Sequence, residues 1–97
     1  MKRLFLSQPM RGKSDKEIRA EREKATQEAS RAVDDTVVII DSFFDNYDGN
    51  AVQFLGKSIE KLGEADIAYF VPGWREARGC VIENQVCKAY DIPVIES

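Results

Sequence analysis

The sequence predicts an α/β domain built on a four-stranded parallel sheet. Four short apolar runs, at residues 3–7, 37–41, 67–71 and 93–96, alternate with three longer segments. Each run is rich in Val, Ile, Phe and Leu and nearly unbroken, which is typical of strands buried on both faces of a parallel sheet. The longer segments carry apolar residues at helical spacing. This alternation indicates helices on both faces of the sheet.

The first predicted helix spans residues 14–33. It starts at Ser14, and Glu17 follows three residues later, which is the pattern of a capping box. Arg, Glu and Lys occupy the outer face. The inner face is an apolar stripe at helical spacing, made of Ile18, Ala25, Ala29, Ala32 and Val33.

The second predicted helix spans residues 51–62 and the third spans residues 79–90. Gly63 can end the second helix with a positive φ, whereas Gly56 is unfavourable inside it. We expect the inward side chains to be Ala51, Leu55, Ile59 and Leu62 in the second helix, and Val81, Ile82, Val86 and Ala89 in the third.

These elements form one domain over residues 1–97, with three layers in a Rossmann- or flavodoxin-like arrangement. Right-handed crossovers limit the possible layouts, and we expect the strand order 2-1-3-4. Ligands of open parallel sheets bind beyond the carboxyl ends of the strands, where the strand order reverses. Here that point lies between the first and third strands, so we expect the site there.

The segments that follow the strands supply the candidate substrate-binding residues. They come from the loop after the first strand, the end of the second strand, the loop after the third strand and the start of the third helix. They are Ser7, Gln8, Pro9, Met10, Arg11, Gly12, Asp41, Gly73, Trp74, Arg78, Gly79 and Cys80.

Glu83 is the candidate catalytic residue. It lies one turn into the third helix among apolar neighbours, where it can point toward the crevice, and the helix N-terminus would favour its ionised form. A carboxylate there can stabilise an oxocarbenium-like sugar or attack it covalently, as cleavage of an N-glycosidic bond requires. The alternative is a solvated surface glutamate.

The other candidates also have two interpretations each. Arg78 and the backbone N–H groups of Gly79 and Cys80 can hold a phosphate, or Arg78 and Arg75 are ordinary surface charges. Trp74 can stack on a base or pack on a neighbouring subunit. Ser7 and Gln8 can bond a sugar hydroxyl or base, or they only complete the loop.

Composition narrows the function classes. A net charge of −3 gives no reason to expect a nucleic-acid polymer or a membrane as partner, and no apolar run approaches the ~20 residues of a bilayer span. On one helix, Cys80 and Cys87 would lie about 10 Å apart, too far for a disulfide, and two free thiols suit the cytoplasm. Without histidine, and without a Walker or calcium loop, we expect no metal and no cofactor.

Four segments carry a resemblance to a known family. They are LFLSQPM at residues 4–10, EADIA at 64–68, GCVIE at 79–83 and AYDIPVI at 89–95. In this order and spacing they resemble the nucleoside 2-deoxyribosyltransferases, and the start of the chain is similar to short phage and bacterial proteins of that superfamily.

The resemblance implies that Glu83 is the nucleophile and that the ligand is a nucleoside or nucleotide. It also implies a homo-oligomer in which neighbouring chains complete the sites. In the transferases an aspartate lies six residues before the glutamate, where this chain has Ala77. The branch that hydrolyses nucleoside 5′-monophosphates holds the phosphate at a helix start, which Arg78 would suit.

Three functions follow as hypotheses. The first is an enzyme that acts on an N-glycosidic bond, with Asp41 or Asp45 protonating the leaving base. The second is a non-catalytic binder of a nucleotide or nucleotide-derived signal, which Ala77 favours. The third is an interaction protein with Trp74, Phe43 and Phe44 as contact anchors.

Overall fold

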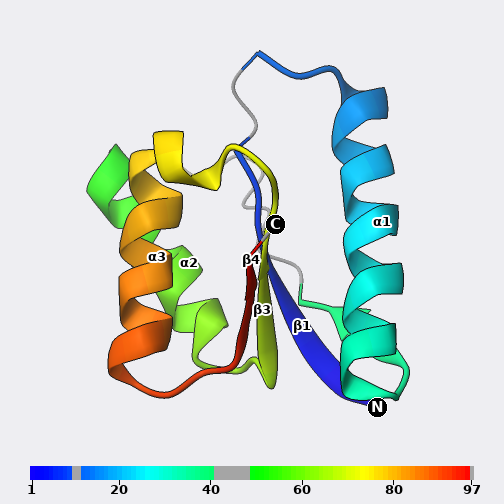
Figure 1. Ribbon diagram of the computed structural model, residues 1–97. Coiled ribbons are helices and arrows are strands. Elements are labelled where there is room, and N and C mark those ends of the chain that lie inside the picture. The colour runs from blue at the N-terminus through cyan, green and yellow to red at the C-terminus, as the bar shows by residue number, and fades with distance from the viewer. Residues whose placement is uncertain (10–11, 41–48, 97) are drawn as a thin grey trace.

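The computed structural model describes residues 1–9, 12–40 and 49–96, and these form the predicted βαβαβαβ order (Figure 1). The strands are parallel and lie in the order β2-β1-β3-β4, so the predicted fold class and strand order are confirmed. The elements are β1 (Lys2–Ser7), α1 (Asp15–Val33), β2 (Val37–Ile39), α2 (Ala51–Leu62), β3 (Ile67–Phe70), a 3₁₀ turn (Trp74–Glu76), α3 (Arg78–Ala89) and β4 (Val94–Glu96).

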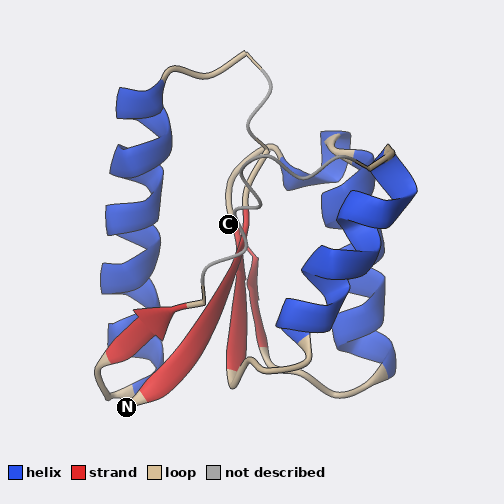
Figure 2. Ribbon diagram, turned by 180° about the vertical axis from the view of Figure 1, so that it is seen from behind, coloured by secondary structure: helices blue, strands red, loops and turns tan. Residues whose placement is uncertain are grey.

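The helices cover the two faces of the sheet unequally. α1 lies alone on one face, and α2 and α3 lie together on the other, as the two opposite views show (Figures 1 and 2). On the α1 face, Ala25 and Ala29 pack against aliphatic strand residues and Tyr69. Their small side chains let the helix approach the strands closely. Ala32, expected to point inward, is exposed near the end of the helix.

β1 is one of the two inner strands of the sheet and pairs with both β2 and β3. It pairs with β2 through Lys2–Leu4 and with β3 through Leu4–Ser7, so that Ser7 lies beside Phe70. Both strands therefore end at the same edge of the sheet. That edge carries the loop after Ser7 and the turn after Phe70, which are the segments expected to form the site.

Local signals set the helix ends. Ser14 caps α1 and accepts a hydrogen bond from the Glu17 N–H, as the capping pattern predicts. α2 has a complete capping box between Asn50 and Gln53. Gly63 follows α2 but has a φ of −61°, so the expected positive φ is wrong. The reason is that the chain continues in helical turns, in which the N–H of Gly63 bonds the carbonyl of Ile59.

The face that α3 turns inward differs from the predicted one. The buried residues are Cys80, Glu83, Asn84 and Cys87, whereas Ala89 is exposed and Val81, Ile82 and Val86 are half-buried. The buried polar groups have partners: Asn84 Nδ2 donates to Glu96 at the end of β4, and Glu83 accepts from two serines. Hydrogen bonding thus compensates for burying a polar line that the apolar pattern could not indicate.

Within the described ranges, no helix combines the length and apolar character that crossing a bilayer requires.

Candidate functional site

The carboxyl group of Glu83 is the central polar group at the carboxyl end of β1. The side chain is 7% exposed, so the alternative of a solvated surface glutamate is wrong. Ser7 Oγ donates a hydrogen bond to Oε1 at 2.8 Å, and Ser58 Oγ donates to Oε2 at 2.5 Å. The three residues come from β1, α2 and α3, so the packing of these elements assembles the group.

Burial dominates the electrostatics of this carboxyl. Desolvation raises the pKa of Glu83, and the hydrogen bonds from Ser58 and Ser7 offset that rise only in part. The expectation that the helix N-terminus would favour the ionised form is therefore wrong in its net effect, because burial outweighs it. In the described part of the chain no cationic side chain forms an ion pair with Glu83.

Two free thiols flank Glu83 on the same line of α3. Cys80 precedes it by one turn, Cys87 follows it by one turn, and both are buried. Burial raises the pKa of Cys80, and for Cys87 burial and the Glu83 charge raise it to about 11. Both thiols are therefore neutral at physiological pH, which makes them packing residues rather than nucleophiles.

A pocket of about 750 Å³ opens beyond the carboxyl ends of β1 and β3, at the start of α3. Its lining combines the loop after β1, the turn after β3 and the first residues of α3: Pro9, Lys13, Pro72, Gly73, Glu76, Ala77, Arg78 and Gly79. Gly73 has a φ of 91°, which a residue with a side chain adopts only with strain, and this turn directs the chain from β3 back toward α3. Glu83 itself lies one helical turn beyond Gly79 and is not part of the lining.

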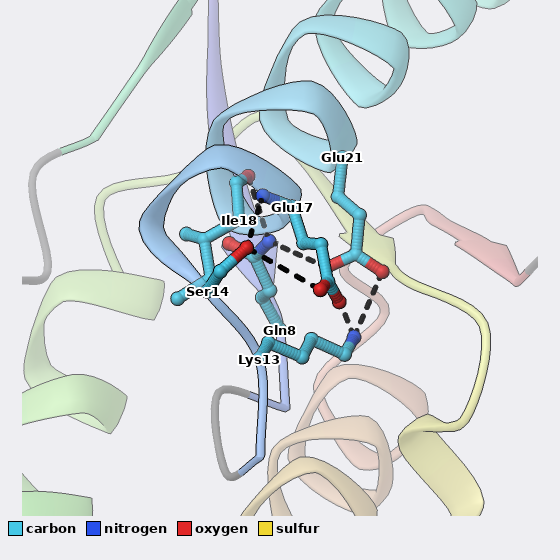
Figure 3. Close-up of polar contacts among 6 residues, drawn as sticks. All are labelled: Gln8, Lys13, Ser14, Glu17, Ile18 and Glu21. Atoms are coloured by element: carbon cyan, nitrogen blue, oxygen red, sulfur yellow. Dashed lines mark hydrogen bonds and ion pairs between the residues drawn. The ribbon is translucent and has the colours of Figure 1, made fainter.

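Hydrogen bonds and an ion pair hold the loop after β1 to α1 through Gln8 at its start and Lys13 at its end (Figure 3). Lys13 Nζ lies 2.9 and 2.8 Å from the two carboxylate oxygens of Glu21. Gln8 Nε2 donates to Glu21 Oε1 at 2.9 Å and to the carbonyl of Ile18 at 3.0 Å. Glu21 thus holds the residues before and after residues 9–12, and it sets where Lys13 reaches the pocket.

Trp74 follows neither of the two interpretations that the sequence suggested. Its ring is 5% exposed and packs in the chain's own core, with its centroid 5.3 Å from that of Phe70. The Arg75 guanidinium covers the ring at 4.5 Å from its centroid. Buried in this way, the indole presents no face for a base, and the expected contact with a neighbouring subunit is not needed to cover it.

The structure sorts the predicted site residues into groups. Pro9, Gly73, Arg78 and Gly79 line the pocket, Ser7 holds Glu83, and Cys80 and Trp74 are buried. Gln8 helps to tie the loop after β1 to Glu21, and exposed Gly12 has a positive φ in the same loop. Met10, Arg11 and Asp41 lie outside the described residues, as do Phe43, Phe44 and Asp45.

Sequence reasoning missed four functional candidates, namely Lys13, Glu21, Ser58 and Glu76. Ser58 was open to prediction, because it lies three residues after Leu55 and four before Leu62, on the inward line of α2. Lys13 adjoins the predicted loop. No comparable signal pointed to Glu21 or Glu76, which are ordinary charged residues until the loop and the pocket are seen.

Comparison with known proteins finds no match for the chain among protein-family models, curated proteins or solved structures.

Proposed function

We propose that the protein is a nucleoside- or nucleotide-processing enzyme that acts on an N-glycosidic bond, with Glu83 as the nucleophile. The observation that carries this proposal is the Glu83 carboxyl, buried at the carboxyl end of β1 and without an ion pair among the described residues. No cation among residues 1–9, 12–40 and 49–96 pairs with this carboxylate when it is ionised. It therefore stabilises positive charge that develops on a sugar ring.

The reaction proceeds in two steps. A carboxylate oxygen of Glu83 attacks the anomeric carbon, the C–N bond breaks, and its electron pair leaves with the base, which takes up a proton. Water, or a ring N–H group of a second base, then attacks the same carbon, loses its proton to solvent, and breaks the bond to Glu83 so that the carboxylate is freed. Water gives hydrolysis and a second base gives deoxyribosyl transfer. Asp41 and Asp45, the candidate proton donors, remain predictions.

The pocket supports the choice of substrate class. Arg78 and Gly79, the first residues of α3, line it, so the Arg78 guanidinium and the backbone at the helix start suit the phosphate of a nucleoside 5′-monophosphate. Ala77 replaces the aspartate that binds deoxyribose in the transferases that the sequence resembles. Both features favour the hydrolase of nucleotides over the transferase. We place the protein in the cytoplasm, where Cys80 and Cys87 stay reduced, and expect a second copy of the chain as partner.

The test is a panel of deoxynucleosides and their 5′-monophosphates incubated with the wild-type protein and with Glu83→Gln. We expect the wild type to release free base, and the substitution to lower the rate by about 10³-fold or more, because an amide cannot act as the nucleophile. Glu60→Gln, an exposed glutamate of α2, is the matched control and should keep full activity. Equal rates for Glu83→Gln and wild type would remove Glu83 from the mechanism.

A non-catalytic binder is the second candidate, and one observation favours it. Both oxygens of Glu83 already accept hydrogen bonds from the chain itself, as in a purely structural carboxyl. Calorimetry with the same panel separates the two functions: a ligand that binds and is recovered intact supports the binder. If no member of the panel binds or reacts, the interaction protein becomes the better proposal.

A further inference from the structure

Ser58 reaches Glu83 from a helix that carries no other site residue. Its hydroxyl lies 2.5 Å from Oε2, on the opposite side of the carboxyl from the Ser7 hydroxyl at Oε1. Each carboxylate oxygen therefore has one neutral donor, and the two donors belong to different elements. The terminal torsion of a glutamate is broad, so a single donor would leave the carboxyl plane free to turn. Two donors fix that plane.

With its plane fixed by the two hydrogen bonds, the Glu83 carboxylate can still react. A carboxylate oxygen has two acceptor sites, and one hydrogen bond occupies only one of them. The second site on each oxygen remains for a reacting carbon. A hydroxyl also stabilises the charged carboxylate without neutralising it, as a cation would.

The docking of α2 does not depend on the Ser58 hydroxyl. Leu55 approaches the start of α3 so closely that a Cβ built on Gly79 would lie 3.8 Å from Leu55 Cδ1. Leu62, at the other end of α2, is fully buried. Apolar contacts on both sides of Ser58 thus hold the helix, and the hydroxyl is left with an orienting role.

We propose that Ser58 is a positioning residue that holds the Glu83 carboxylate in its reactive orientation and favours its ionised form. The catalytic part of this inference rests on the proposed function of Glu83. The orienting part rests on the two hydrogen bonds alone.

The surroundings make the role of Ser58 measurable through pH. The groups that face Glu83 are Ser7 from β1, Ser58 from α2, and the thiols of Cys80 and Cys87 on its own helix. Lys13, in the loop before α1, acts electrostatically on Cys80. Both thiols have raised pKa values, so Glu83 is the group in this cluster that titrates on the acid side. Without the Ser58 donor, burial acts with less opposition and the pKa of Glu83 rises further.

The experiment compares Ser58→Ala, Ser58→Thr and the control Glu60→Ala on the same helix. The first readout needs no substrate: the carboxyl ¹³C shift of Glu83 is followed by NMR against pH. We expect the midpoint to move to higher pH in Ser58→Ala, to return toward the wild-type value in Ser58→Thr, and to stay unchanged in Glu60→Ala. An unmoved midpoint in a folded Ser58→Ala would overturn the proposal.

The second readout is the rate of base release against pH. We expect kcat to fall about ten- to a hundredfold in Ser58→Ala with KM little changed, and the acid limb to shift in the same direction as the NMR midpoint. A threonine that restores neither quantity contradicts a hydrogen-bonding role. If the NMR midpoint moves and no variant turns over any substrate, the proposed function fails while the orienting role stands. If base is released but the acid limb of Ser58→Ala does not move, the proposed function stands and the orienting role of Ser58 fails.

Discussion

Glu21 and Glu83 lie on opposite faces of the sheet near the end of β1, and their partners differ. Glu21, on α1, accepts hydrogen bonds from the Lys13 ammonium and the Gln8 amide. Glu83, on α3, accepts from the hydroxyls of Ser7 and Ser58 and is more deeply buried. The same side chain thus has a cationic partner on one face and two neutral ones on the other.

The difference separates a carboxylate that builds the structure from one that suits chemistry. The Lys13 charge neutralises Glu21, which gives stability to the loop and leaves little charge for a ligand. The burial of Glu83 without an ion pair costs stability when the group is ionised. Natural proteins retain such costly groups mainly where they serve a function.

The largest stability effect that we expect from this comparison is at Glu21. Glu21→Ala leaves the Lys13 ammonium and the Gln8 amide without their shared acceptor, and should lower the free energy of unfolding by about 2 kcal/mol. Urea denaturation at neutral pH measures it. Glu23→Ala, an exposed residue of the same helix, is the control and should stay within about 0.5 kcal/mol of wild type. Equal losses in the two variants would mean that the contacts of Glu21 with Lys13 and Gln8 add nothing to the free energy of unfolding.

A smaller change of opposite sign is expected at Glu83. Its pKa is raised in the folded state, so the folded protein holds the proton at pH values where the unfolded chain has lost it, and wild-type stability falls as pH rises through this interval. Glu83→Gln keeps an acceptor and a similar shape but does not titrate. It should be more stable than wild type by on the order of 1 kcal/mol at pH 8, with the advantage shrinking toward pH 4. Denaturation curves at several pH values test this, and an advantage independent of pH would contradict it.

The smallest effect concerns the start of α3. Side-chain caps are present on α1 and α2, from Ser14 and Asn50, but the N-cap of α3 is Ala77, which has extended backbone angles and no capping oxygen. Ala77→Ser should add about 0.5–1 kcal/mol of stability, and Ala77→Asp should do the same while introducing a carboxylate at the pocket wall. Thermal unfolding measures the gain. A lowered Tm in both variants would show that the half-buried site rejects a polar side chain.

The fold was predictable because its signals are local and repeated. Continuous apolar runs indicate strands buried on both faces, and the handedness of the crossovers restricts their order, so the order 2-1-3-4 followed without coordinates. The rotation of α3 was not predictable in the same way. Its buried line contains Glu83 and Asn84, and whether a polar residue can be buried depends on partners from Ser7, Ser58 and Glu96, which are distant in sequence.

The candidate site was predictable in position more than in detail. The topology placed it at the ends of β1 and β3, and Glu83, Ser7, Gly73 and Arg78 are found there. The exposed position predicted for the Trp74 ring was wrong, because an aromatic residue in a loop has the same sequence signal whether it faces a ligand or the core. Ser58 could have been found on the inward line of α2, whereas Glu21 acts through contacts with Gln8 and Lys13 that leave no periodic pattern in a sequence.

Trp74 is the one tryptophan of the chain, and its position gives the protein an intrinsic optical probe. The indole is buried against Phe70, beneath the Arg75 guanidinium. The residue before Trp74 in the chain is Gly73, which lines the pocket. A ligand that reorders the turn after β3 changes the environment of this single fluorophore. Its emission can therefore report binding in unlabelled protein, for compounds that are turned over and for those that are only held.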